Sequence, residues 1–115
     1  GQWAVWTRRA VELLEQCRTL AERESPIPAA LVRLAVAVTD ANAEIFDAAN
    51  GFAGCIPGIH EILRRQGLLE GIECLDPSES LSPGQPDDID RVCRAYPELN
   101  DDDFVAAHRD EWLAD

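Results

Sequence analysis

Three carboxylates stand close together near the middle of the chain, at Asp40, Glu44 and Asp47. They are three or four residues apart, so in a helix they share one face. A di-iron site uses carboxylates arranged in this way, but it also needs Glu-x-x-His pairs on facing helices, and this chain has none. The spacing therefore predicts a solvated or boundary face of a helix.

The cysteines and one histidine are the other candidates for metal chemistry. Cys55 and His60 are five residues apart, while Cys17, Cys74 and Cys93 are scattered and form no Cys-x-x-Cys pair. Structural zinc normally takes four ligands from recognisable pairs. We therefore expect a packed, hydrogen-bonded His60 and four reduced thiols, although four cysteines also allow two disulfides.

All ten basic residues are arginine, and the sequence contains no lysine. A Schiff base with a carbonyl substrate needs a lysine amine, and a guanidinium stays protonated and cannot replace it. Lysine-dependent covalent catalysis is thus excluded for this chain acting alone. Gly51, Gly54 and Gly58 have the wrong spacing for a nucleotide-binding loop and are expected to be loop glycines. No catalytic, cofactor-binding or metal-binding residue is predicted.

Two long helices are predicted in residues 1–50. The first, from about Trp3 to Arg23, carries apolar residues at alternating spacings of three and four. This stripe consists of Trp3, Trp6, Ala10, Leu13, Cys17 and Leu20. We expect it to pack on neighbouring elements or against another copy of the chain.

The second helix is predicted from Pro28 to about Asn50, where Gly51 can take the left-handed conformation that ends a helix. Its apolar side is Leu31, Leu34, Val38, Ile45 and Phe46, and Ala35 and Ala49 are expected to allow close approach of a neighbour.

Three shorter helices are predicted in the rest of the chain. The third has Pro57 in its first turn and ends before Gly67, where Leu68 can fold back on Leu63 in a Schellman motif. The fourth starts near Ser82-Pro83-Gly84-Gln85, which has capping-box spacing, although Pro86 competes with that start. It runs to about Tyr96 and is expected to bury Ile89, Val92, Cys93 and Tyr96.

The last helix has the strongest signals. Asn100 is predicted to cap it, and the carboxylates of residues 101–103 suit its positive end. Leu99 and Phe104 occupy the positions of a hydrophobic staple. The buried stripe is expected to be Phe104, Val105, His108 and Trp112, with His108 at a boundary.

The composition sets wider limits. A length of 115 residues and an apolar fraction of 46% fit one domain with a modest core. The formal net charge of −12 disfavours nucleic acid and anionic membranes as partners, because they carry charge of the same sign. No apolar run approaches the roughly 20 residues of a membrane span. No signal peptide is visible, and a cytoplasmic location is expected.

Residues 50–96 contain an ordered series of helix ends and turns. The series is Asn50, Pro57, Gly67-Leu68, Pro77 and Leu81-Ser82. Together with the strings RRQGLLEGI, CLDP, LSPGQ and IDRV, it resembles the C-terminal tail of the dihydrodipicolinate synthase and N-acetylneuraminate lyase family, in a divergent branch. The resemblance extends over about residues 40–97.

The resemblance implies both a fold and a role. Members of that family are pyruvate-handling aldolases with a TIM barrel followed by a small helical subdomain, and this chain would be only that subdomain. Its partners would be the rest of the barrel, other subunits, or both, and it would have no cofactor. The catalytic lysine and tyrosine of the family lie on barrel strands and match no position here. The parent would be a class I aldolase-type carbon–carbon lyase.

The sequence thus predicts an all-α single helical (sub)domain of about five helices. Residues 1–50 form two long helices, residues 51–97 the family-like tail and residues 98–115 the terminal helix. Two alternatives stay open on the residues alone, a stand-alone acidic helical protein-interaction module and a small metal-binding bundle. Because the stripe of the first helix needs a covering surface, we expect the chain to self-associate or to depend on a partner.

Overall fold

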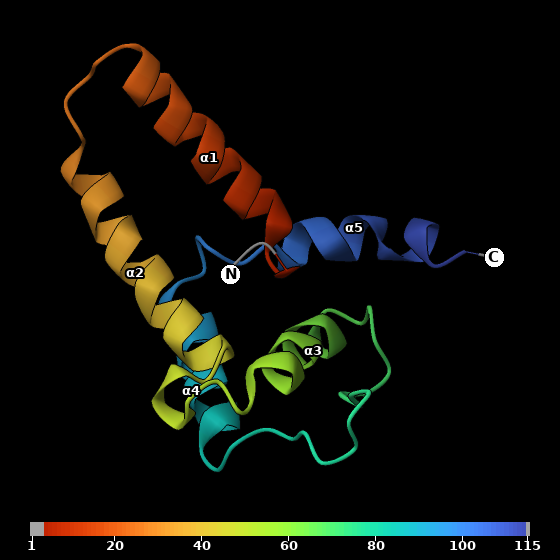
Figure 1. Cartoon of the computed structure of the whole chain (residues 1–115). Coiled ribbons are helices and arrows are strands. Elements are labelled where there is room, and N and C mark those ends of the chain that lie inside the picture. The colour runs from red at the N-terminus through yellow and green to blue at the C-terminus, as the bar shows by residue number, and fades with distance from the viewer. Residues whose placement is uncertain (1–3, 115) are drawn as a thin grey trace.

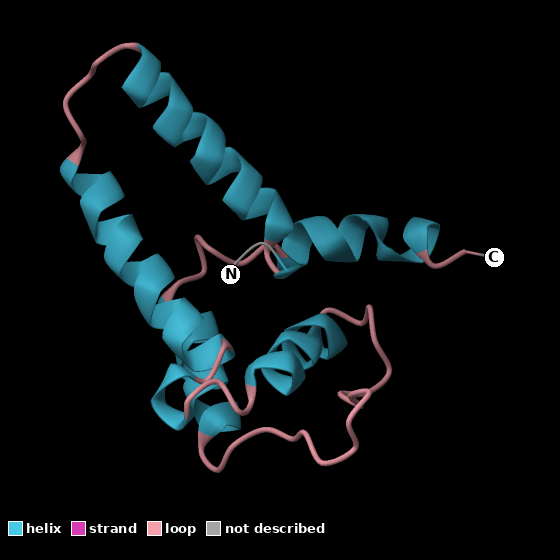
Figure 2. Ribbon diagram, in the orientation of Figure 1, coloured by secondary structure: helices cyan, strands magenta, loops and turns pink. Residues whose placement is uncertain are grey.

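The computed structural model describes residues 4–114, and Figure 1 labels its five α-helices. They are α1 (Thr7–Glu22), α2 (Ala29–Ile45), α3 (Cys55–Arg65), α4 (Gln85–Ala95) and α5 (Asp102–Trp112), with a short 3-10 helix, η2 (Ala48–Asn50), after α2. In Figure 2 loops join these helices, and residues 4–114 contain no strand. The predicted all-α fold of about five helices is confirmed.

The core lies where α2 packs against α4, its most extensive helix partner. Ile45, Ile89 and Val92 are fully buried there. The small residues that allow the close approach are Ala37 and Ala41, both buried. The prediction that Ala35 and Ala49 would do this was wrong, because Ala35 lies on the opposite side of α2 and Ala49 lies beyond its end, and both are exposed.

The first helix begins later than predicted. It starts at Thr7 because Trp6 has a left-handed backbone with φ of 55°, which is incompatible with an α-helix. This turn accompanies burial of the Trp6 side chain, which is 1% exposed and joins the core. Within the predicted stripe Ala10 is buried, but Cys17 is exposed and Leu13 and Leu20 are only partly covered. Trp3 lies outside the described residues.

The second helix ends earlier than predicted. It stops at Ile45, and Asp47 takes a left-handed conformation with φ of 58° before η2 reaches Asn50. The break turns the Asp47 side chain inward, where it is 4% exposed. Gly51 has the predicted positive φ of 61°, although it ends η2 and not α2.

The ends of the third helix follow the prediction closely. Pro57 lies in the first turn of α3. After the helix Gly67 has a φ of 74°, and the Leu68 amide donates to the Leu63 carbonyl oxygen at 2.9 Å. The Gly67 amide donates to the Arg64 carbonyl oxygen at the same distance, which completes the Schellman motif.

The molecule is extended for its length. Its Cα radius of gyration is 15.5 Å, whereas a compact domain of this length has about 13 Å. The difference comes from an arm made of α1, the connection at residues 23–28 and the first half of α2. Figure 1 shows these two helices converging at that connection and separating toward α3, α4 and α5. We call the part of the molecule outside the arm the body.

Candidate functional site

The first polar cluster joins the end of α2 to the starts of α3 and α4. Asp47 Oδ2 accepts hydrogen bonds from the Gly54 amide at 2.8 Å and the Ser82 hydroxyl at 2.6 Å, while Oδ1 accepts from the Asn50 side chain at 2.7 Å. Burial alone would raise the pKa of Asp47, but these bonds outweigh it and the pKa is lowered. The solvated or boundary face predicted for this residue was wrong.

Gln85 completes this α2–α3–α4 junction. Its amide Nε2 donates to the carbonyl oxygens of Ile45 at 3.3 Å and Gly54 at 3.0 Å, and its Oε1 accepts from the Ser82 amide at 2.9 Å. The last bond is one half of the predicted capping box. The other half is absent, because the Gln85 amide donates to the Ser82 carbonyl oxygen at 3.0 Å and not to the Ser82 hydroxyl, which donates to Asp47. Gln85 therefore satisfies a carbonyl at the end of α2 that has no partner within the helix.

Two glycines make this junction possible. A Cβ on Gly58 would lie 2.0 Å from the Ile45 carbonyl oxygen, and a Cβ on Gly54 would lie 2.1 Å from Gln85 Oε1. Both glycines are buried, and Gly58 lies inside α3. The prediction that they are loop glycines was therefore wrong for Gly58. Glycine is needed at both positions because neighbouring groups occupy the space of a side chain.

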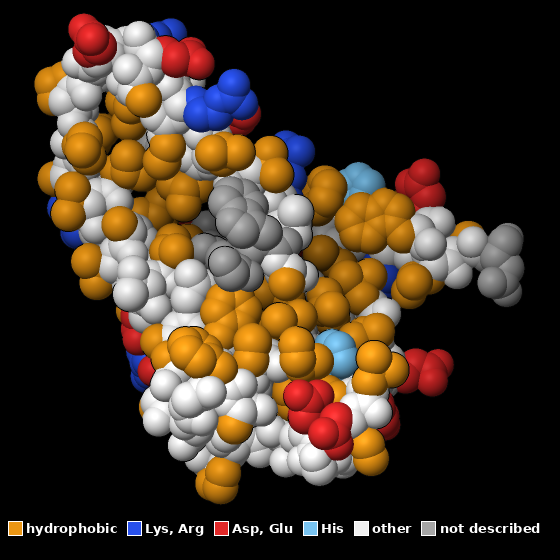
Figure 3. Space-filling view, viewed as in Figure 1, with side chains coloured by type: hydrophobic (Ala, Val, Ile, Leu, Met, Phe, Trp, Pro, Cys, Tyr) orange, Lys and Arg blue, Asp and Glu red, His pale blue; other side chains and the backbone are white. Residues whose placement is uncertain are grey.

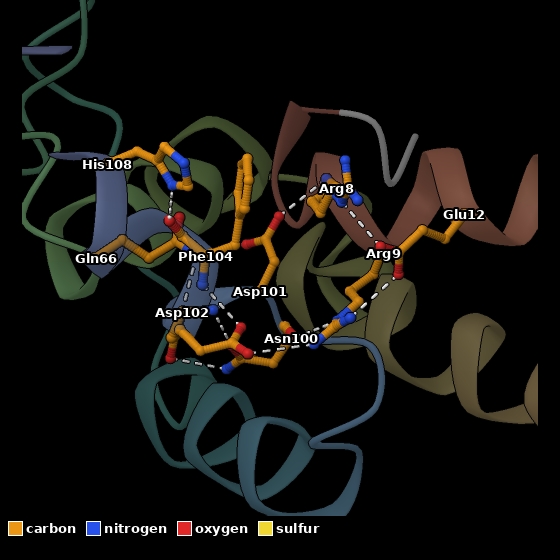
Figure 4. Close-up of polar contacts among 10 residues, drawn as sticks. Arg8, Arg9, Glu12, Gln66, Asn100, Asp101, Asp102, Phe104 and His108 are labelled. Atoms are coloured by element: carbon orange, nitrogen blue, oxygen red, sulfur yellow. Dashed lines mark hydrogen bonds and ion pairs between the residues drawn. The ribbon is translucent and has the colours of Figure 1, made fainter. Parts of the chain in front are cut away.

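The second polar cluster joins the starts of α1 and α5 and is drawn in Figure 4. Asp101 is buried, and its Oδ2 accepts from the Arg8 amide at 3.0 Å while its Oδ1 accepts from the Gln66 side chain at 2.9 Å. The carboxylate thus caps α1, a helix more than 90 residues away in sequence. Asn100 Oδ1 accepts from the Asp102 amide at 2.6 Å and so satisfies the first amide of α5, but the N-cap itself is Asp101, one residue later than the predicted Asn100.

An aromatic row and a pocket lie beside this α1–α5 junction. Phe104, His108 and Trp112 follow one face of α5, with ring centroids 4.4 to 5.8 Å apart, and the Arg8 guanidinium lies 5.3 Å from the centre of the Phe104 ring. Only Val105 of the predicted buried stripe is buried, and Trp112 is 49% exposed. An open, mainly apolar pocket of about 340 Å³ lies between the starts of α1 and α5 and the end of α3.

His60 and the cysteines form no reactive group. His60 Nδ1 lies 3.4 Å from the Ile72 carbonyl oxygen, to which it can donate, and 3.8 Å from Cys74 Sγ. Desolvation, reinforced by nearby carboxylates, raises the pKa of the Cys74 thiol, which opposes its activation. All four cysteines are free thiols. Within residues 4–114 no group of three His, Cys, Asp or Glu side chains could hold a metal ion.

The other two carboxylates of the central group bind α4. Arg91 donates to both oxygens of Asp40 at 2.8 and 2.9 Å and to Glu44 at 3.0 Å, and the Tyr96 hydroxyl donates to Asp40 at 2.5 Å. The hydrogen bonds from Arg91, then from Tyr96, lower the pKa of Asp40 to about 2. These partly exposed side chains match the boundary face that was predicted for them.

One face of α2 is left uncovered by the described residues, 4–114. Val32 and Val36 are 55% and 66% exposed, and they border a shallow groove of about 470 Å³ that also includes Ala35, Thr39 and Ala43. Figure 3 shows hydrophobic side chains along both helices of the arm. The arm therefore offers apolar surface for association, whereas the two polar clusters tie the helices of the body together.

Searches with protein-family models and among curated proteins and solved structures found no match to this chain. No helix of the described residues is long and apolar enough to cross a membrane. Sequence reasoning missed the buried roles of Asp47, Gln66 and Asp101, and it found Gln85 only through the capping-box spacing. The described residues thus offer two polar junctions and an open apolar arm as the features on which a function can rest.

Proposed function

We propose that this chain is the C-terminal helical subdomain of a dihydrodipicolinate synthase-like, pyruvate-dependent Schiff-base lyase. It is non-catalytic alone and serves packing and subunit contacts. The observation that carries this proposal is the uncovered apolar arm, in which exposed Val11, Leu14, Val32 and Val36 leave α1 and α2 without a complete set of neighbours. Contiguous exposed apolar side chains normally mark a surface that a partner covers.

Two further features support the proposal. The series from Asn50 through Pro57 and Gly67-Leu68 to Ser82 resembles the family tail, and three of these positions make defined contacts. Asn50 binds Asp47, Gly67 ends α3 and Ser82 ties the start of α4 to Asp47. The lack of lysine is also consistent with a subdomain that leaves covalent chemistry to a barrel.

The test compares this chain with the product of its complete gene. Pyruvate and borohydride should add no mass at any side chain of this chain, because it has no lysine amine that can form an imine. The gene should encode about 200 upstream residues of alternating strands and helices, with a lysine near the end of a strand. That lysine should be trapped by pyruvate, and its replacement by arginine should abolish both trapping and turnover. A gene without such a region would overturn the proposal.

A stand-alone acidic helical interaction module is the second candidate. It is favoured by the closed polar junctions of the body, in which Asp47, Gln85 and Asp101 all find partners inside this chain. Such a module would unfold cooperatively by itself and would have no barrel upstream in its gene. The gene sequence therefore distinguishes it from the lyase subdomain.

A further inference from the structure

The uncovered face of α2 has the residue spacing of a helix-pairing surface. Its central residues alternate at three and four positions, as in the contact seam of a coiled coil. They are Ala29, Val32, Val36, Thr39 and Ala43. This stripe lies opposite the core-facing side of α2, which is marked by Ala37, Ala41 and Ile45.

The chemistry of the stripe suits burial. None of its residues is charged, and the hydroxyl of Thr39 already donates to the Ala35 carbonyl oxygen at 2.9 Å, so it needs no further partner. The alanines at both ends allow a second helix to approach closely. Covering the stripe would remove the exposed valine side chains from water at no cost in unpaired polar groups.

Charges beside the stripe are self-complementary. Arg33 and Asp40 lie on the same flank, seven residues apart. Arg33 makes no ion pair with any residue in the described part of the chain, while Asp40 and Glu44 share the single cation Arg91, which leaves one negative charge in excess. In an antiparallel pair of helices related by a two-fold axis at Val36, Arg33 of each copy lies within one helical turn of Asp40 of the other.

The distribution of charge over the chain favours the same arrangement. Residues 1–46 contain five arginines and six acidic residues, whereas residues 47–115 contain five arginines and sixteen acidic residues. Two bodies would therefore repel each other, but two arms are nearly neutral. Antiparallel pairing sets each body beside the arm tip of the other copy. The two bodies are then separated by about the length of α2, roughly 25 Å, well beyond a Debye length of ~8 Å.

We propose that the outer face of α2 binds a second copy of this chain, antiparallel and centred on Val36, with Arg33 of each copy beside Asp40 of the other. This inference rests on the proposed role in subunit contacts and names the partner and the contact. A parallel pair is disfavoured because its two-fold axis would place the two charged flanks on opposite sides of the seam, so that Arg33 would face the uncharged flank of the other copy near Ala35 and would meet no carboxylate. A strongly basic partner is disfavoured because the arm carries almost no net charge.

Sedimentation equilibrium of this chain tests the association. The wild type should sediment at twice its mass of 12.7 kDa. Val36→Glu should raise the dimer dissociation constant by about 30-fold or more, because it buries an unpaired charge at the centre of the contact. Leu75→Glu, at a fully exposed body position, is the matched control and should leave the dimer intact. Far-UV circular dichroism should be unchanged in both variants, since both sites are exposed.

Cysteine cross-linking tests the orientation. In a Cys17→Ser background, which removes the exposed native thiol, Val36→Cys should form a disulfide with its own counterpart. Val32→Cys should not, because residue 32 is four positions from the two-fold axis in each copy. The two sulfurs would then be about 12 Å apart along the helices, too far for a disulfide. A monomeric wild type, a dimer unaffected by Val36→Glu, or equally fast cross-linking at both sites would overturn the proposal. None of these outcomes bears on the lysine-trapping test, so the two proposals fail separately.

Discussion

Replacing Gly58 by alanine sets two effects of opposite sign against each other. In an exposed helix interior, glycine to alanine stabilises by about 0.5–1 kcal/mol because the glycine backbone loses more freedom on folding. In α3 the added Cβ would lie 2.0 Å from the Ile45 carbonyl oxygen and 2.8 Å from Gln85 Nε2. An ordinary contact needs at least 3.4 Å. The start of α3 must therefore move more than 1 Å away from the end of α2.

The expected loss follows from what this movement breaks. Overpacking a closely packed site costs about 1–3 kcal/mol, and weakening the hydrogen bonds of Gln85 to Ile45 and Gly54 adds about 1 kcal/mol. After subtracting the gain in helix propensity, Gly58→Ala should destabilise the chain by about 2–3 kcal/mol. For a chain of this size the midpoint of thermal unfolding should fall by roughly 10 °C.

Urea and thermal unfolding followed by circular dichroism provide the measurement. Gly51→Ala is the matched control, because its Cβ would meet nothing within 4 Å and only the positive φ is strained. It should cost about 1 kcal/mol. If Gly58→Ala were as stable as the wild type or more stable, helix propensity would dominate, and the close approach of α3 to α2 would be refuted.

Three other predictions concern the polar clusters and the thiols. Asp101→Ala should lower the free energy of unfolding by about 1–2 kcal/mol through loss of the α1 cap, whereas the exposed Asp103→Ala should stay within about 0.5 kcal/mol of wild type in the same urea titration. The pKa of Asp40 is lowered to about 2 in the folded chain, so the contribution of this carboxylate to stability is present above its unfolded pKa and is lost as the pH falls toward 2. The difference in the free energy of unfolding between wild type and Asp40→Asn should therefore shrink between pH 6 and pH 2. A difference that stays constant over this range would contradict the prediction. Thiol titration should find Cys17 reacting first in the native chain and all four cysteines after denaturation; fewer than four would indicate a disulfide.

The local signals of the sequence predicted the helices well, because the end of a helix is determined by a few residues that are neighbours in sequence. Gly67 and Leu68 specify the end of α3, and Asn100 specifies the start of α5, through bonds that span no more than five residues. The left-handed turns at Trp6 and Asp47 could not be predicted in this way. Each is accompanied by burial of its side chain among segments distant in sequence, and this burial offsets the cost of the positive φ.

The same distinction explains why the polar junctions escaped prediction. The triplet at residues 101–103 fits local helix capping, and nothing in the sequence shows that Asp101 is the residue that turns toward α1 and accepts from the Arg8 amide. An acidic residue at the start of a helix can accept hydrogen bonds from the backbone amides of that helix or from those of a neighbouring helix. Only the packing of α1 against α5 decides between the two. Spacing alone could identify Gln85 because one of its bonds, to the Ser82 amide, is local.

These junctions bear directly on the proposed association through α2. The C-terminal end of that helix is fixed by bonds from Gln85 of α4 to its last carbonyls, and by bonds to Asp40 from Arg91 of α4 and from Tyr96, which caps α4. The outer stripe is therefore presented by a helix whose orientation is set before a second copy binds, which reduces the conformational entropy lost on association. Asp40 contributes both to the packing of α4 on α2 and to the proposed contact, since it binds Arg91 of α4 and lies beside the stripe. Replacing it should weaken folding and pairing together, whereas replacing Val36 should weaken pairing alone.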